Sequence, residues 1–410
     1  MRKLLPQLFS WFTAILLFFI PSNLFLVLSE SFGFVNGLRI DYLLPKLFFT
    51  DFLVLIVIAC GVMLAHKKLF YLAYRVILSG PVVFLSLLLL VAQAYSAIPL
   101  ISFYTVLKTG EFLLLFLVLF LNKKYLDKNV LLVSITAAIL IQLLFSFFQH
   151  TYGHSLTPYW LLGESSLNSS MLGLARASFG GAEKLLAYGT TPHPNVLAGI
   201  SVLLTLLALR LKKYKRNIFW LLLIPTVIIL YFTQSIGAYI GLILGSIGAW
   251  NKRLLGKNIL IVVIFSVLII PFFITPLSRT FEDTSLQRRE VLNQAVFSMI
   301  EKNPLFGVGL GNFTAVLEKY MTNKEYVRFV QPAHNVAWLL FAETGLLGAL
   351  ICWQVIKRVM TRFYVRPIAL ALIPLLALDH YIVTTQSGIL ATVFFMVFCL
   401  KKIKVEEPLE

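Results

Sequence analysis

Long apolar runs, separated by short clusters of charge, dominate the pattern of this chain. About twelve runs approach the length of roughly 20 residues that a helix needs to cross a bilayer. They lie near residues 4–28, 47–65, 76–92, 102–121, 130–149, 195–209, 218–233, 235–250, 259–275, 336–356, 368–383 and 387–400. The runs do not alternate in polarity as barrel strands do, so they predict helices. We therefore expect one all-α polytopic membrane domain over residues 1–410, with about twelve transmembrane helices.

Composition agrees with a membrane protein and excludes soluble enzymes, disulfide scaffolds and disordered tails. Apolar residues make up 59% of the chain and charged residues 13%, against roughly a quarter charged in an average soluble domain. The three cysteines lie in apolar runs without a neighbouring Cys or His at metal-ligand spacing, so we expect no metal site. The net charge of +17 reflects membrane topology here, so no nucleic-acid partner is expected.

The positions of the basic residues predict the orientation. With the N-terminus in the cytoplasm, most Lys and Arg residues, beginning with Arg2 and Lys3, fall on the cytoplasmic side. The positive-inside rule then places both termini in the cytoplasm and favours an even number of helices. Two long segments face outward, residues 150–194 and 276–333. Function is therefore expected on the extracytoplasmic face.

Polar and ionisable side chains within the predicted helices gather toward their outer ends. The set comprises Lys46, Asp51, Lys108, Glu111, Gln142, Gln149, His193, His334, Asp379 and His380. Such groups are costly in lipid, so each is a candidate functional residue. A transport pathway would continue through the inner halves, and the asymmetry therefore favours an outward-facing polar cavity. Lys108 and Glu111 lie three positions apart on one helical face, where mutual neutralisation and a functional role are both open.

The second outward segment contains a predicted amphipathic helix. A Thr-x-x-Gln capping box at 284–287 and apolar residues at helical spacing predict a helix over about 285–302, lying on the membrane surface. Its first turns carry Arg288 and Arg289, with Arg279 nearby. Guanidinium groups at a membrane lip suit bidentate binding of phosphate, and contact with lipid headgroups is the alternative.

A glycine-rich string and a histidine follow this helix. Residues 307–311 read Gly-Val-Gly-Leu-Gly, but no strand precedes them and the P-loop lysine is missing, so we expect a tight turn. His334 precedes the next helix and is a candidate general base, with a satisfied polar residue at a helix start as the alternative. Segments 191–196 and 331–336 look alike, because each places His and Asn just after a proline at the start of a helix.

Five segments carry a resemblance to a known family. They are residues 189–195, 233–235, 288–311, 334–335 and 343–348. Together they resemble the O-antigen ligase and polymerase family of bacterial membrane proteins. The resemblance implies a glycosyltransferase of the GT-C class that needs no metal or cofactor and uses an undecaprenyl-pyrophosphate-linked glycan at the outer face of the cytoplasmic membrane. In this family the acceptor is a lipid A core, a growing glycan or a protein hydroxyl.

The resemblance also implies roles for individual residues. Arg288 or Arg289 would bind the pyrophosphate, and His334 would assist the acceptor hydroxyl or stabilise the departing phosphate. Family members commonly carry an Arg directly after the Ser at position 235, where this chain has Ile236. Another cation would then help to hold the diphosphate. The further substrate-binding candidates are Lys108, Arg176, Arg279, His193, Asn195 and Asn335.

The leading expectation is an O-antigen ligase-like transferase in envelope glycan or lipopolysaccharide biosynthesis. A polysaccharide polymerase of the same family is the alternative, because the acceptor cannot be identified from the residues. Some members are described as bicarbonate transporters, but no inverted repeat with broken midplane helices is evident. A non-catalytic envelope assembly scaffold is a third alternative. It is suggested by Ile236, which stands where the family commonly has an Arg. Convergence of Arg288, Arg289 and His334 on one cavity would favour the transferase over the scaffold.

Overall fold

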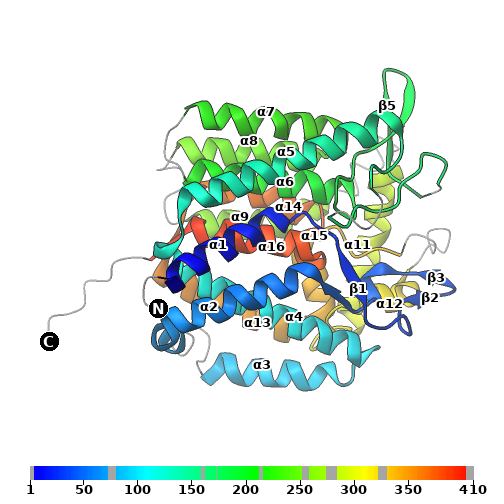
Figure 1. Ribbon diagram of the computed structural model, residues 1–410. Coiled ribbons are helices and arrows are strands. Elements are labelled where there is room, and N and C mark those ends of the chain that lie inside the picture. The colour runs from blue at the N-terminus through cyan, green and yellow to red at the C-terminus, as the bar shows by residue number, and fades with distance from the viewer. Residues whose placement is uncertain are drawn as a thin grey trace, which may run out of the picture.

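Helices lying side by side form most of the molecule (Figure 1). The structure is a computed structural model that describes residues 4–72, 80–157, 162–171, 173–211, 216–251, 258–273, 284–321 and 330–402. The bundle contains α1 (Leu4–Phe19), α2 (Phe49–Leu72), α3 (Gly80–Gln93), α4 (Pro99–Asn122), α5 (Lys128–Tyr152), α6 (Pro194–Leu211), α7 (Arg216–Thr233), α8 (Ile236–Trp250), α9 (Ile259–Ile269), α13 (Val336–Arg362), α14 (Leu372–Ala377) and α16 (Gln386–Cys399).

Shorter elements connect these helices. They are the helices α11 (Thr284–Lys302), α12 (Phe313–Val316) and α15 (Tyr381–Thr384), and the 3-10 turns η1 (Asp41–Leu43), η3 (Lys123–Tyr125), η5 (Ile270–Phe273), η6 (Leu317–Tyr320) and η8 (Pro367–Ala371). Four antiparallel strand pairs complete the list: β1 (Phe25–Val27) with β4 (Lys46–Phe48), β2 (Phe34–Val35) with β3 (Leu38–Arg39), β5 (Arg176–Phe179) with β6 (Ala182–Leu185), and β7 (Phe363–Val365) with β8 (Leu400–Lys402).

Most of the apolar runs of the sequence coincide with apolar helices in the described ranges. Four of these helices, α4 with η3, α5, α6 and α13, are long and apolar enough to cross a membrane by length and composition. The remaining apolar helices are shorter. The mostly helical membrane architecture is therefore confirmed, whereas the number of twelve crossings stays a prediction.

Several of the predicted runs are not continuous helices. The run at 4–28 stops being helical at Phe19, and Pro21 follows, which cannot donate a backbone hydrogen bond. Its last part forms β1, in which Phe25 faces Phe48 of β4. The run at 368–383 is also broken. The three residues 378–380 separate the end of α14 from the start of α15. These breaks place backbone and polar side chains at one end of the bundle.

The buried core is centred on α6. Almost all of its residues are buried, and it contacts α5, α7, α8 and α16. The backbone of the neighbouring α8 lies close to the backbone of η8. Small residues allow membrane helices to approach one another in this way. A Cβ atom at Gly248 would lie 2.2 Å from the Pro367 carbonyl oxygen of η8. At the edge of the bundle, α3 exposes Phe84 and Leu87, as expected of a surface that meets lipid (Figure 1).

The helix α11 occupies the position of the predicted amphipathic helix, but its apolar face covers protein. Leu292, Val296 and Met299 are buried in one cluster with Leu339 and Ala342 of α13. The apolar face of α11 is therefore buried against α13. A position of α11 at the membrane surface stays a prediction. The arginines of α11 are thereby fixed relative to α13.

The glycine-rich string docks on a break in α13. Gly345 has a φ of 60° inside that helix, which interrupts the regular backbone hydrogen bonding. The Gly309 N–H uses the opening and donates to the Glu343 carbonyl oxygen at 2.9 Å. A Cβ atom at Gly307 would lie 2.3 Å from the Glu343 carbonyl carbon, so a side chain has no room there. The string is a tight docking turn, in agreement with the sequence prediction.

The two ends of the bundle differ in structure. At one end, here called the terminal end, α1 begins and α16 ends (Figure 1). Lys123 Nζ donates there to the Leu400 carbonyl oxygen at 3.1 Å, and the Asp127 N–H donates to Ser10 Oγ at 2.8 Å. The opposite end, the loop end, carries β1 to β6, α11 and α12 (Figure 1). Which end faces the cytoplasm stays a prediction.

Candidate functional site

Ionisable side chains from three separate segments meet at the loop end. His334, Asp379 and His380 each offer one nitrogen or oxygen atom, and these atoms lie within 4.8 Å of one another. The rings of His334 and His380 meet edge to face, with their centroids 5.1 Å apart. Arg289 of α11 lies within electrostatic range of all three. We call these four residues the acid–histidine cluster.

The carboxylate of Asp379 is held by two hydrogen bonds. It lies in the break between α14 and α15, where the His380 N–H donates to Asp379 Oδ1 at 2.7 Å. Asn195, in the first turn of α6, donates from Nδ2 to Asp379 Oδ2 at 2.8 Å. Each carboxylate oxygen therefore has a partner, and the central helix α6 fixes the orientation of the acid.

Two glutamines of α5 position the segment that leads to Asn195. Gln149 Nε2 donates to the Gly189 carbonyl oxygen and its Oε1 accepts from the Gly189 N–H, both at 2.8 Å. Gln142 Oε1 accepts from the Thr190 N–H at 2.9 Å. Gly189 has a φ of 57°, and a Cβ atom there would lie 2.2 Å from Gln142 Oε1. These two glutamines therefore act as supports for the start of α6.

Asn335 fixes His334 from the opposite side. Its Oδ1 accepts from the Trp338 N–H at 3.0 Å and caps α13. Its Nδ2 donates to the Val267 carbonyl oxygen at 2.7 Å and to the Ala377 carbonyl oxygen at 3.3 Å. Asn335 therefore ties the start of α13 to α9 and to the end of α14, which brings His334 next to Asp379.

Two polar atoms of this cluster are unpaired. His334 Nδ1 and Arg289 Nε are both buried without a hydrogen-bond partner among the described residues. Buried polar atoms in proteins nearly always have partners, so two orphans at one place indicate a position for a ligand. Withdrawal from water lowers the pKa of His334, although Asp379 opposes the shift. The imidazole is therefore neutral near pH 7.

The spacing of His334, Asp379 and His380 would also allow a metal ion. Imidazole nitrogens with one carboxylate are a ligand set that Zn²⁺ accepts. Both oxygens of Asp379 already accept hydrogen bonds, and His380 Nδ1 is 2.7 Å from Thr384 Oγ1. The neighbouring charge of Arg289 also opposes a divalent cation. Hydrogen bonds of this kind also orient the ligands of metal centres, so the charge of Arg289 is the one feature of these contacts that disfavours a metal ion.

The residues expected from the sequence are distributed over more than one place. Arg289 and His334 belong to the cluster, and His193 lies beside it, with its Nδ1 accepting from the Asn195 N–H at 3.2 Å. Arg288 is the neighbour of Arg289 on α11 and is exposed. Arg279 lies outside the described residues.

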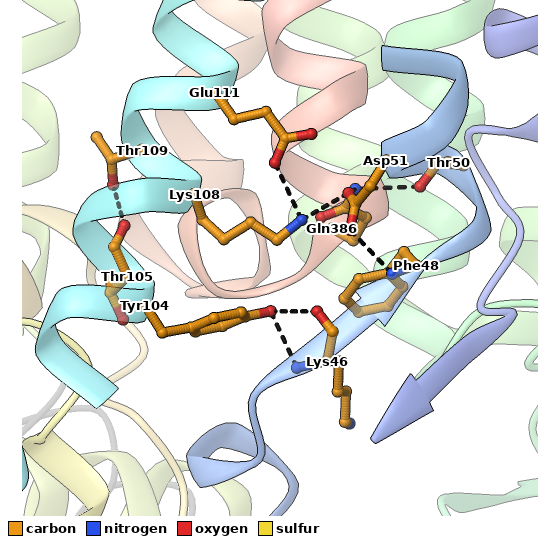
Figure 2. A network of polar contacts seen from close by, with 10 residues as sticks. All are labelled: Lys46, Phe48, Thr50, Asp51, Tyr104, Thr105, Lys108, Thr109, Glu111 and Gln386. Atoms are coloured by element: carbon orange, nitrogen blue, oxygen red, sulfur yellow. Dashed lines mark hydrogen bonds and ion pairs between the residues drawn. The ribbon is translucent and has the colours of Figure 1, made fainter. Parts of the chain in front are cut away.

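Lys108 belongs to a separate network between α2, α4 and α16 (Figure 2). Its Nζ lies 2.5 Å from Asp51 Oδ1 and 3.1 Å from Glu111 Oε2. Gln386 Nε2 donates to the same Asp51 oxygen, and the Phe48 N–H donates to Asp51 Oδ2 at 2.9 Å. We call this the Lys108 network. Since its charge is already engaged by two carboxylates, we leave Lys108 out of the proposed site.

Arg176 is likewise engaged within its own segment. Its guanidinium donates to the carbonyl oxygens of Ser169 and Met171 and lies 3.5 Å from Glu183 of the paired strand. We therefore leave it out of the proposed site as well. Ile236, at the position where the resemblance led us to expect an Arg, begins α8 and exposes 71% of its surface. The position of the missing Arg is thus at the loop end, but no cation replaces it there on α8.

Two members of the cluster were candidate polar residues in the sequence but were not assigned to the site. Asp379 and His380 appear in the sequence as adjacent polar residues in an apolar run, which was the available signal. Their role depends on the break between α14 and α15, which the apolar pattern does not predict. Tyr42 of η1 was missed too, and its ring lies edge to face with that of His380 at 5.3 Å.

Part of this site lies in a segment that is similar to a known protein family. Residues 195–352 match the family model described as O-antigen ligase. The matched segment contains Asn195, Arg289 and His334, whereas Asp379 and His380 lie beyond it. A search of curated proteins found no match.

Proposed function

We propose that this chain transfers a glycan from undecaprenyl pyrophosphate to an acceptor hydroxyl, because residues 195–352 match the family model described as O-antigen ligase. One observation carries this proposal: Arg289 and His334 meet, with Asp379, at the loop end. A cation for the leaving group and a base for the acceptor are the two groups that such a transfer requires.

The reaction can be written with these groups. The acceptor oxygen attacks the anomeric carbon of the donor while its proton passes to a ring nitrogen of His334. The bond between that carbon and the phosphate oxygen breaks, and the electron pair leaves with undecaprenyl pyrophosphate. Charge develops on the leaving phosphate, where the Arg289 guanidinium stabilises it. No carboxylate nucleophile is needed, because pyrophosphate is already a good leaving group.

Asp379 has a positioning role in this proposal. Once His334 accepts a proton, the resulting imidazolium is stabilised by a nearby carboxylate. The hydrogen bond from Asn195 holds that carboxylate in place. Arg288, exposed one position before Arg289, supplies a second cation for the distal part of the pyrophosphate.

The setting of the reaction follows from the proposed topology. The termini lie in the cytoplasm, and the loop end opens at the outer face of the bacterial cytoplasmic membrane, where a polyprenyl-linked donor is available. The fold is of the GT-C type and the chemistry is metal-independent. The acceptor class decides between a ligase, which uses a lipid A core or protein, and a polymerase, which uses a growing glycan.

The test is glycan transfer by the full-length protein in reconstituted membranes. Purified protein is incubated with native undecaprenyl-pyrophosphate glycan and extracted envelope lipids, and products are identified by gel and mass spectrometry. His334→Ala should lower the transfer rate by about 100- to 10,000-fold, the usual contribution of a general base. His154→Ala, at an exposed histidine outside the cluster, is the matched control.

The outcomes separate the alternatives. Product formation that depends on His334 identifies a transferase and, through the mass of the product, its acceptor. Unchanged transfer by His334→Ala would remove this residue from the mechanism. Failure of the wild type to bind the donor would favour the transporter or the assembly scaffold.

A further inference from the structure

A second cluster of cations lies at the terminal end of the bundle, opposite the acid–histidine cluster. Lys123 follows α4, Arg210 lies in the last turn of α6, and Arg366 follows β7. They surround the end of α16, where Lys123 Nζ donates to the Leu400 carbonyl oxygen and the Arg366 N–H donates to the Cys399 carbonyl oxygen, both at 3.1 Å. Arg210 lies within electrostatic range of both other cations. We call these three residues the basic cluster.

The basic cluster has no acidic partner within the described part of the chain. The electrostatic neighbours of Lys123 and Arg366 are each other, Arg210, and the uncharged Cys399 and Tyr364 side chains. The salt bridges found among the described residues all involve other side chains. Three like charges at a protein surface of reduced dielectric repel one another. An anion bound between them would relieve that repulsion.

The arginines of the cluster are also partly withdrawn from water. Arg210 Nε and Arg366 Nε are each buried without a hydrogen-bond partner among the described residues. A basic residue that only marks membrane topology extends its charge to water. These two instead keep an N–H group buried, which is unfavourable unless an acceptor is present. The planar guanidinium fork matches the oxygen atoms of phosphate.

We infer that Lys123, Arg210 and Arg366 form a binding site for a phosphate group. A phosphate supplies both the negative charge that the cluster lacks and the acceptor oxygens that its buried N–H groups lack. Basic pockets between helices at a membrane surface bind anionic lipid headgroups. A soluble phosphate presents the same oxygens, so the experiment must distinguish a lipid phosphodiester from a free anion.

The experiment uses the full-length protein in phosphatidylcholine nanodiscs. One arm adds phosphatidylglycerol to the nanodisc, and the other adds inorganic phosphate at constant ionic strength. Binding and the midpoint of thermal unfolding are measured for the wild type and for the Arg210→Gln/Arg366→Gln variant. Lys124→Gln/Lys128→Gln is the matched control, because it removes the same charge at the same end from two exposed side chains.

The wild type and the control should bind one of the two probes at least about tenfold more tightly than the double arginine variant, since bonds to charged groups have been lost. Adding that probe should raise the unfolding midpoint of the wild type and leave that of the variant unchanged. Without either probe, the variant should be at least as stable as the wild type, because a source of repulsion is gone. A response to phosphatidylglycerol alone assigns a lipid, and a response to inorganic phosphate alone assigns a soluble anion.

The inference is overturned if neither probe binds or if the variant and the control respond like the wild type. It is also overturned if the control loses binding as strongly as the arginine variant, since the effect would then be one of general charge. Glu406, Glu407 and Glu410 lie outside the described residues, so their triple Gln variant is included. Binding that occurs only in that variant would show that the chain's own carboxylates occupy the cluster.

Discussion

The acid–histidine cluster and the Lys108 network both bury a carboxylate near a cation, but they differ in how that cation is paired. In the Lys108 network, the ammonium contacts two carboxylates and both oxygens of Asp51 have partners, although Glu111 Oε1 has none among the described residues (Figure 2). In the acid–histidine cluster, Arg289 Nε and His334 Nδ1 have none among the described residues. The comparison teaches that an unusual charge within an apolar helix is a poor guide to function. The pairing of the cation is a better one.

The largest expected effect is loss of stability in the Lys108 network. Lys108→Ala leaves the carboxylates of Asp51 and Glu111 without their cation, and breaking a buried ion pair costs about 3–5 kcal/mol. We expect a marked fall in the unfolding midpoint measured by differential scanning fluorimetry in detergent. Thr109→Ala, an exposed neighbour on α4, is the control and should change little. A stable Lys108→Ala protein that no longer binds donor would instead return Lys108 to the site.

The next effect concerns Arg289, which should matter for transfer more than for folding. Arg289→Ala removes the cation beside His334, and we expect the transfer rate to fall by about 100-fold, as for loss of one charge-stabilising donor. Arg289→Lys should retain part of the rate, because it keeps the charge and loses the bidentate fork. Lys302→Ala is the matched control, since it removes an exposed cation at the other end of α11. Transfer by Arg289→Ala at the rate of this control would make Arg289 a structural residue.

A smaller effect separates the two look-alike segments at 191–196 and 331–336. Asn195 donates to Asp379, whereas Asn335 caps α13 and contacts α9 and α14. Asn195→Ala should lower kcat about tenfold with KM nearly unchanged, because one hydrogen bond to the charged Asp379 is lost. Asn335→Ala should lower the unfolding midpoint instead, by the loss of a helix cap and two further bonds. The opposite assignment of the two effects would refute the positioning role of Asn195.

The sequence predicted those parts of the fold that depend on local pattern. The apolar runs could be recognised from the sequence alone. The same holds for the arginines at the start of α11 and for the candidate base His334, because each lies in a short segment that can be interpreted without knowledge of tertiary contacts. The end of α1 was misjudged, because Phe25–Val27 is as apolar as a helix and only its pairing with β4 makes it a strand. The mean hydropathy of a helix-length window contains no information about pairing between strands.

The remainder of the site depends on contacts between distant segments. Lys108 was a reasonable candidate until its distance to Asp51, on another helix, was known. Asp379 was visible as a charge in an apolar run, but its contact with Asn195 requires α6 and α14 to be neighbours. Side-chain pairing across the bundle is therefore what separated structural charges from candidate site residues.

The smallest expected effect is that of metal removal. Arg289 places a positive charge beside Asp379 and the histidines, which opposes the binding of a divalent cation there. Transfer in reconstituted membranes should therefore continue unchanged after dialysis against EDTA. The matched sample is dialysed without chelator and assayed with the same donor. Loss of transfer that added Zn²⁺ restores in the wild type, and fails to restore in His380→Ala, would instead make His334, Asp379 and His380 a metal centre and reduce their likeness to the Lys108 network still further.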